Sequence, residues 1–215
     1  MGRTQKILTT GLWAIVVIGM LALVATRAVT NRDESKPDDP RNTARSSQSE
    51  KFPPLFESPA FALTDQNARP FSKADLLGKV WIADFIFVNC GGPCPIMTGK
   101  LANVQKQVNR PDVKLVSFSV DPERDSPSAL KEYADRFGAD DSRWTFLTGD
   151  KQAIYDIAAA MKITAKPATA DSPIIHSELF LLVDRAGQVV GIYHSSDEAE
   201  IERLVADSIE LADRK

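Results

Sequence analysis

The chain has 215 residues and a formal net charge of −3, with 26 Lys and Arg against 29 Asp and Glu. This mildly acidic balance gives no reason to expect a nucleic-acid partner, because such proteins usually carry a basic patch. The chain has only two cysteines and two histidines, so a metal site or a disulfide must be built from very few side chains.

The amino-terminal segment has the length and composition of a membrane anchor. Ile7 to Thr26 is a run of 20 residues without a charge, and about 20 apolar residues suffice for a helix to cross a bilayer. Arg3 and Lys6 precede this run, which favours a cytoplasmic amino end over residues 1–6. The competing interpretation is a cleaved signal peptide, but signal peptides have a shorter apolar run and Arg27 interrupts the small-residue cleavage pattern. We predict a retained single-pass anchor over residues 7–26 in the inner (cytoplasmic) membrane, with the rest of the chain on the periplasmic side.

The segment that follows the anchor is polar. Residues 27–50 contain no aromatic side chain and only three apolar residues, Ala28, Val29 and Ala44. Such a segment buries too little surface to offset the entropy of ordering it. We therefore predict a flexible linker over residues 27–50 and one compact domain over residues 51–215.

Strand and helix patterns alternate along this domain from Gly78 onward. Nearly continuous apolar runs, typical of strands buried on both faces, occupy residues 80–88, 113–120 and 144–149. Apolar residues recur at helical spacing after each run, over residues 97–108, 130–137 and 154–161. Two further runs, 178–183 and 188–193, flank the turn "DRAG" as in an antiparallel hairpin, and a last amphipathic helix includes Ile201, Leu204 and Val205. Parallel βαβ units followed by a hairpin and a closing helix predict an α/β fold of the thioredoxin type, with a central mixed sheet flanked by helices.

Both cysteines lie in the stretch "NCGGPCP", residues 89–95, directly after the first buried strand. Cys90 falls in the loop after that strand, and Cys94 with Pro95 opens the next helix, where proline is well tolerated. Functional sites of α/β sheets lie beyond the carboxyl ends of the strands. We expect the positive potential of the helix end to stabilise thiolates here.

The spacing of Cys90 and Cys94 leaves three interpretations open. A structural disulfide fits the distance of one helical turn, but it would close a very short loop and stabilise little. A redox pair is the second interpretation, although the usual motif has two intervening residues rather than three. A metal site is the third, because two thiolates are soft ligands that favour copper(I), zinc or iron–sulfur centres. Structural zinc usually needs four protein ligands, whereas copper(I) accepts three, so the metal interpretation depends on a third ligand.

The two histidines differ as candidates for that ligand. His176 follows a proline-containing loop at the mouth of the predicted hairpin, from which it could reach the first helix. His194 lies just before the last helix, where Ser195, Ser196 or Asp197 could cap the helix. We therefore expect His176, rather than His194, to be the ligand.

These stretches together resemble the SCO/SenC family. The residues that carry the likeness are, in order, "DFIFVNCGGPCPIM", "SFSVDPERDSP", "FLTGD" and "IIHSELFLLVDRAGQVV". Members of this family are membrane-tethered, thioredoxin-like copper proteins associated with the assembly of cytochrome c oxidase. The likeness extends from about Phe56 to the carboxyl terminus. The Cys-x-x-x-Cys-Pro motif and "VDPERD" are its most specific elements.

The resemblance implies copper, as Cu(I) or Cu(II), bound by Cys90, Cys94 and His176. It implies a metallochaperone that delivers copper to the binuclear site of cytochrome c oxidase subunit 2, with a reversible Cys90–Cys94 disulfide that gates binding. Other copper chaperones or thioredoxin-like reductants are expected as further partners. Asp121 could support the site or cap a turn, and Met97 falls in the apolar stripe of the helix.

Two enzymes are the alternatives to a chaperone. A membrane-tethered thiol–disulfide reductase would use the same two sulfurs to keep the cysteines of the oxidase site reduced, without needing His176. A peroxidase is a weaker alternative, because no arginine lies beside "VNCGGPC". The chain also departs from many family members in having Ile175, rather than an acid, before the histidine, and in a shorter, less acidic loop over residues 166–173.

Overall fold

The computed structural model describes residues 51–167 and 174–214, and the elements named below belong to the unit Phe52–Lys215. The predicted anchor over residues 7–26 and the linker over residues 27–50 lie outside the described residues. Within the described ranges, no helix combines the length and the apolar character needed to span a membrane.

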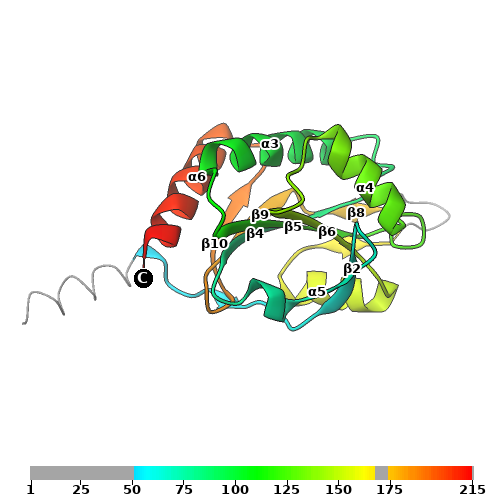
Figure 1. Cartoon of the computed structure of the whole chain (residues 1–215), viewed down its shortest axis with the longest axis horizontal. Helices are drawn as coiled ribbons and strands as arrows, with labels where there is room; N and C mark the ends of the chain where they lie inside the picture. The colour runs from blue at the N-terminus through cyan, green and yellow to red at the C-terminus, as the bar shows by residue number, and fades with distance from the viewer. Residues whose placement is uncertain (1–50, 168–173, 215) are drawn as a thin grey trace, which may run out of the picture. The chain divides into compact units, whose positions relative to one another are not determined.

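The domain is built on a mixed sheet in the strand order β1-β10-β9-β4-β5-β6-β2-β3, seen edge-on in Figure 1. Its strands are, in chain order, β1 (Phe56–Glu57), β2 (Ala62–Asp65), β3 (Pro70–Ser72), β4 (Val80–Ile86), β5 (Val113–Ser119), β6 (Trp144–Thr148), β9 (Leu179–Val183) and β10 (Gln188–His194). Strands β4, β5 and β6 run parallel, while β9 pairs antiparallel with both β4 and β10. The predicted parallel units and the hairpin after them are confirmed.

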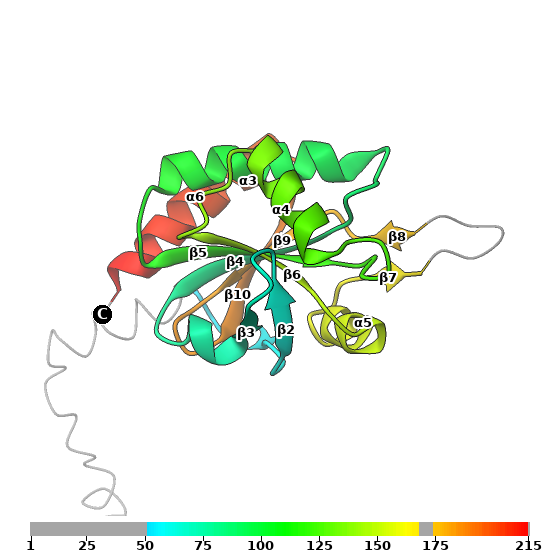
Figure 2. The same cartoon turned by 45° about the vertical axis from the view of Figure 1, so that its right-hand side comes forward.

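Helices cover both faces of the sheet. They are α3 (Pro93–Val108), α4 (Pro127–Arg136), α5 (Lys151–Ala160) and α6 (Glu198–Asp213), with a 3-10 helix, η1, over Lys73–Leu76. Figures 1 and 2 show α3, α4 and α6 on one face and α5 on the other. Every residue of β4 is buried, because alternate side chains of a strand covered on both faces enter opposite cores.

The two faces have separate apolar cores. Ile82 and Ile86 of β4 pack with α3, α4 and α6, whereas Trp81 and Phe85 pack with α5. Helix α3 follows the carboxyl end of β4 after a short loop and packs on the face of Ile82 and Ile86. The start of α3 and the loop before it, which contains Cys90, therefore lie at the edge formed by the carboxyl ends of the parallel strands.

The structure also contains short elements that the sequence patterns did not predict. Strands β1, β2 and β3 and helix η1 precede Gly78, and a separate two-stranded sheet joins β7 (Ala165–Lys166) to β8 (Ile175–His176). Each of these strands has two to four residues, which is too short for an alternation of apolar and polar residues to stand out.

Candidate metal centre

The two cysteines are held by the junction between β4 and α3. Helix α3 begins at Pro93, with Gly92 as its N-cap residue, so Cys94 lies in the first turn and its side chain is fully buried. Cys90 lies in the preceding loop and is half-buried. Its backbone N–H donates to the Phe87 carbonyl at 3.3 Å, which tightens the loop directly after the strand.

His176 reaches this junction on the β7–β8 hairpin. The hairpin pairs Ala165 with His176, and the Ser177 N–H donates to the Thr164 carbonyl at 2.8 Å. Figure 2 shows β7, β8 and the start of α3 at the same end of the sheet. His176 thus lies beside Cys94 at the start of α3, whereas most of the loop over residues 166–173 that was predicted to reach this helix lies outside the described residues.

The three side chains converge closely enough to share one metal ion. Their ligand atoms, the two sulfurs and one imidazole nitrogen, all lie within 4.8 Å of one another, and Cys94 Sγ is 2.9 Å from His176 Nε2. Two thiolates bonded to one ion at about 2.3 Å lie at most about 4.6 Å apart, so only small shifts are required. Among the described residues this is the one group of three or more His, Cys, Asp or Glu side chains with such convergence.

The surroundings of His176 favour a neutral imidazole with its lone pair toward Cys94. His176 Nδ1 lies 3.2 Å from the Ser177 carbonyl oxygen. A carbonyl can only accept, so Nδ1 carries the proton and Nε2 is left free to act as a ligand. Burial also lowers the pKa of His176, although the Ser177 carbonyl and Glu178 act in the opposite direction. The imidazole is therefore ready to bind a metal at neutral pH.

The surroundings of Cys94 contradict our expectation that the helix end stabilises thiolates. Burial raises the pKa of Cys94 far above that of a free thiol, and the hydrogen bond and charge of Cys90 raise it further. A hydrogen bond from the Phe87 backbone acts in the opposite direction but is the weaker effect. Cys94 is thus a protonated thiol at neutral pH, and a metal that binds it must displace the proton.

Phe87 is a residue of the site that sequence analysis missed. Its ring packs edge-on against the His176 ring, with centroids 5.8 Å apart and planes at 85°. Together with its backbone contacts to Cys90 and Cys94, this places Phe87 against all three candidate ligands. Its position directly after the buried strand β4 was the available signal.

The other residues considered as parts of the site have structural positions. Met97 is buried in the core beneath α3, as its place in the apolar stripe indicated. Asp121 accepts the N–H groups of Arg124 and Asp125 through its carbonyl, so it closes the turn after β5. His194 is exposed and its Nδ1 lies 3.0 Å from Glu200, at the start of α6, which Asp197 caps.

Both cysteines are free thiols in this structure. The predicted Cys90–Cys94 disulfide describes another redox state of the same pair and stays a prediction. Their spacing within 4.8 Å leaves a short path to that bond.

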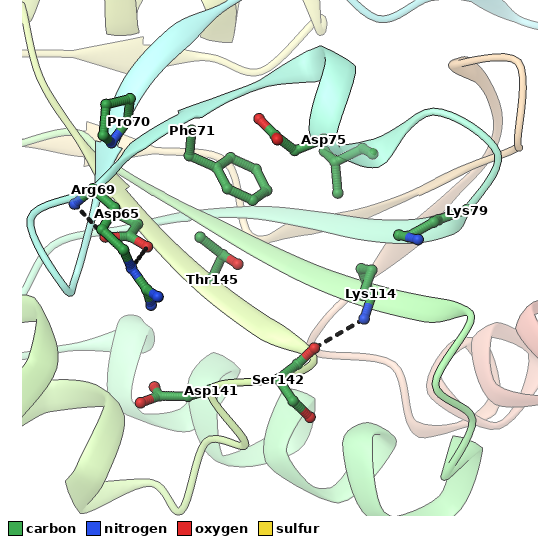
Figure 3. A pocket seen from close by; sticks show the side chains of 11 residues that line it. Asp65, Arg69, Pro70, Phe71, Asp75, Lys79, Lys114, Asp141, Ser142 and Thr145 are labelled. Carbon is green, nitrogen blue, oxygen red and sulfur yellow. Dashed lines mark hydrogen bonds and ion pairs between the residues drawn. The ribbon is translucent and has the colours of Figure 1, made fainter.

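A pocket lies away from the cysteines. This pocket of about 370 Å³ is lined from β2, β3, β5 and β6 and is drawn in Figure 3. Some of its charged side chains form ion pairs: Arg69 with Asp65, and Asp141 with Lys131. Cys90, Cys94 and His176 are not among the residues that line this pocket, so it is separate from the candidate metal centre.

Comparison with known proteins places the chain in a family. The SCO1/SenC family model matches residues 50–212. The SCO1 protein homolog of Bacillus subtilis (strain 168) is 34% identical over 161 residues, which cover 73% of this chain and 83% of the relative.

Two solved structures extend the likeness to the fold. BsSco, described as a member of the Sco family of cytochrome c oxidase assembly proteins, superimposes with a TM-score of 0.68 at 33% identity, covering 76% of this chain and 98% of that chain. Bradyrhizobium japonicum ScoI, solved with copper bound, gives a TM-score of 0.63 at 27% identity, covering 72% and 99%. With its α/β fold and its Cys-Cys-His group, the chain belongs to the SCO1/SenC family.

Proposed function

We propose that this protein binds copper through Cys90, Cys94 and His176 and delivers it to the binuclear copper site of cytochrome c oxidase subunit 2. The observation that carries the proposal is the convergence of two sulfurs and one imidazole nitrogen within 4.8 Å. Two soft thiolates and a neutral imidazole form a donor set that suits copper(I). The copper-bound ScoI relative and the naming of BsSco as a cytochrome c oxidase assembly protein support both parts.

The residues at the site have distinct roles in this proposal. Cys94 gives up its proton when copper binds, because its raised pKa keeps it protonated beforehand. His176 contributes Nε2 without losing a proton, since Nδ1 faces the Ser177 carbonyl. Cys90 is the more exposed thiol and is the sulfur that an acceptor reaches first. Copper is the cargo, and it leaves by exchange of these ligands for those of the acceptor.

The cellular setting belongs to the proposal as well. The charge-free run over residues 7–26 would anchor the protein in the inner membrane, and residues 27–50 would tether the domain on the periplasmic side. In an oxidising compartment, Cys90 and Cys94 would lose two protons and two electrons to an acceptor and form a disulfide. That bond removes both thiolates, so the redox state would gate copper binding. Thioredoxin-like reductants and other copper chaperones are the further partners in this scheme.

The experiment is an anaerobic copper(I) titration of the reduced full-length protein in detergent micelles, competed against a strong chelator. One copper per chain is expected for the wild type. Cys90→Ser and Cys94→Ser should abolish tight binding, and His176→Ala should weaken it. His194→Ala is the matched control, because this histidine lies outside the cluster. Unchanged stoichiometry and affinity in the three ligand variants would refute the proposal.

A thiol–disulfide reductase is the second candidate, favoured by one observation. The pair combines a half-exposed Cys90 with a fully buried Cys94, an arrangement in which one thiol attacks and the other resolves the mixed disulfide. This activity does not need His176. Full reduction of a disulfide in the acceptor's copper site by His176→Ala, with full oxidase assembly, would favour the reductase over the chaperone.

A further inference from the structure

A buried carboxylate from the turn after β5 reaches the loop that carries Cys90. Asp125 is fully buried. Its Oδ2 accepts hydrogen bonds from the Val88 N–H at 3.1 Å and from the Ser119 hydroxyl at 2.6 Å. Val88 follows the end of β4 and Ser119 ends β5. One carboxylate oxygen therefore ties together the carboxyl ends of two neighbouring parallel strands.

The turn that presents Asp125 is itself closed by hydrogen bonds. The Asp125 N–H donates to the Asp121 carbonyl at 2.9 Å, and the Asp121 N–H donates to Ser119 Oγ at 3.1 Å. Arg124 Nε lies 2.6 Å from Asp121 Oδ2. These bonds hold the Asp125 carboxylate in one place, so it is a rigid acceptor for Val88.

Val88 lies within the Phe87–Cys90 segment, which contacts the candidate ligands. The residue before it, Phe87, packs its ring against His176 and accepts the Cys90 N–H through its carbonyl. Its backbone also hydrogen-bonds to Cys94. The hydrogen bond to Asp125 is therefore a polar contact that anchors this segment from outside the β4–α3 connection.

We propose that Asp125 is a positioning residue of the metal centre, which holds the Phe87–Cys90 segment so that the Cys90 sulfur stays within reach of Cys94 and His176. The inference rests on the proposed function and deepens it. The "VDPERD" motif thereby gains a role for its second aspartate, whereas Asp121, the first, closes the turn.

The physical reason lies in the acceptor that Asp125 provides. Asp125 Oδ2 accepts both hydrogen bonds, and these bonds favour the ionised form against burial, which raises the pKa of Asp125. Removal of the side chain leaves the Val88 N–H without its partner in a partly buried position, and the segment gains freedom to move. Copper binding and disulfide formation both require the two sulfurs to approach each other. A looser segment lowers their effective concentration, so both equilibria should weaken by a similar factor.

The test compares Asp125→Ala with a matched aspartate elsewhere, both in the full-length protein. Asp65 is also buried, and its Oδ1 accepts the N–H groups of Asn67 and Arg69, each at 2.8 Å, in the turn between β2 and β3. Strand β2 lies three strands away from β4. Asp65→Ala therefore removes a similar loop-fixing carboxylate without touching the metal centre. Thermal unfolding of each variant reports the general loss of stability.

Two readouts separate positioning from stability. The first is copper(I) affinity by chelator competition. The second, which needs no copper, is the equilibrium with glutathione, in which two cysteine thiols become a disulfide while one oxidised glutathione becomes two reduced molecules. For Asp125→Ala we expect at least a tenfold weaker affinity and a shift of at least tenfold toward the dithiol, or about 30 mV for a two-electron couple. Asp65→Ala should lower the melting temperature and leave both readouts within threefold of wild type.

The outcomes are distinguishable from a failure of the proposed function. If wild type binds no copper, the proposed function fails, and the glutathione equilibrium still tests the position of Cys90. Folded Asp125→Ala with both readouts at wild-type values overturns the inference, as does an equal shift in Asp65→Ala. Should Asp125→Ala not fold, Ser119→Ala removes the second donor to the same oxygen and should move both readouts severalfold in the same direction. No change in that variant would also overturn it.

Discussion

Asp84, the single charged residue within β4, yields a quantitative prediction about stability and pH. It is fully buried, and burial raises its pKa from 3.8 to about 7 against the opposing hydrogen bond from Ser117. Ser117 Oγ donates to Asp84 Oδ1 at 2.5 Å and itself accepts the Trp144 indole N–H at 2.9 Å. Asp84 Oδ2 has no hydrogen-bond partner among the described residues. The folded state therefore holds its proton to a higher pH than the unfolded state does.

The sign and size follow from this difference. Because the folded-state pKa of Asp84 is raised, its contribution to stability is fully present below pH 3.8. That contribution is lost as the pH rises toward 7. A shift of roughly three units at 1.36 kcal/mol each amounts to about 4 kcal/mol in total, of which nearly 3 kcal/mol falls between pH 5 and pH 8. Asp84→Asn cannot ionise, so it lacks this contribution to the pH dependence.

The assay is urea unfolding of wild type and Asp84→Asn between pH 5 and pH 8, followed by tryptophan fluorescence. The unfolding free energy of the variant minus that of wild type should increase by about 3 kcal/mol over this range, because all other titrations cancel in the difference. Ser117→Ala removes the hydrogen bond that lowers the Asp84 pKa and should move the pH-dependent range upward. A difference that does not change with pH would refute the reasoning.

Three further predictions concern the metal centre and the helices. Copper(I) affinity should rise at least tenfold per pH unit between pH 6.5 and 8.5, because Cys94 with its raised pKa releases a proton on binding while neutral His176 releases none. Chelator competition at several pH values measures this dependence. An affinity that does not change with pH would contradict it. Phe87→Leu should weaken copper binding by two- to tenfold, since an edge-on aromatic contact contributes about 0.5–1.5 kcal/mol. A copper(I) titration of the variant beside the wild type measures the change. An unchanged affinity would exclude a role for the ring. Asp197→Ala should cost about 1 kcal/mol of unfolding free energy, because Asp197 accepts the Ala199 and Glu200 N–H groups at the start of α6; urea unfolding measures this, and copper affinity should not change.

The sequence predicted the parts of the fold that are buried on both faces or have a long apolar stripe. The runs over residues 80–88 and 113–120 became β4 and β5 to within two residues, and the hairpin runs became β9 and β10. Strands β1 to β3 were not predicted, because their two to four residues show no usable period. Strand β8, which carries His176, was not predicted for the same reason.

Sequence analysis singled out the three side chains that converge in the structure, but it missed the residues that support them. The spacing of Cys90 and Cys94 and the scarcity of histidines pointed to the ligand atoms, and the structure brings these atoms together. The expectation that the helix end stabilises a thiolate at Cys94 was wrong. A sequence shows the helix end but not the burial, which raises the pKa and outweighs it. The role of Asp125 depends on a turn folding back across two strands, which no local pattern reveals.

The three candidate ligands rest on supports of unequal rigidity, and this bears on how cargo would leave. Cys94 is buried in the first turn of α3, and Cys90 lies in a loop tied to Asp125. His176 lies on a strand of two residues whose pairing partner is β7, outside the main sheet. Elements with few hydrogen bonds open most readily, so we expect His176 to be the first ligand released during transfer. His176→Ala should then pass copper to a chelator faster than wild type, and slower transfer would contradict this order.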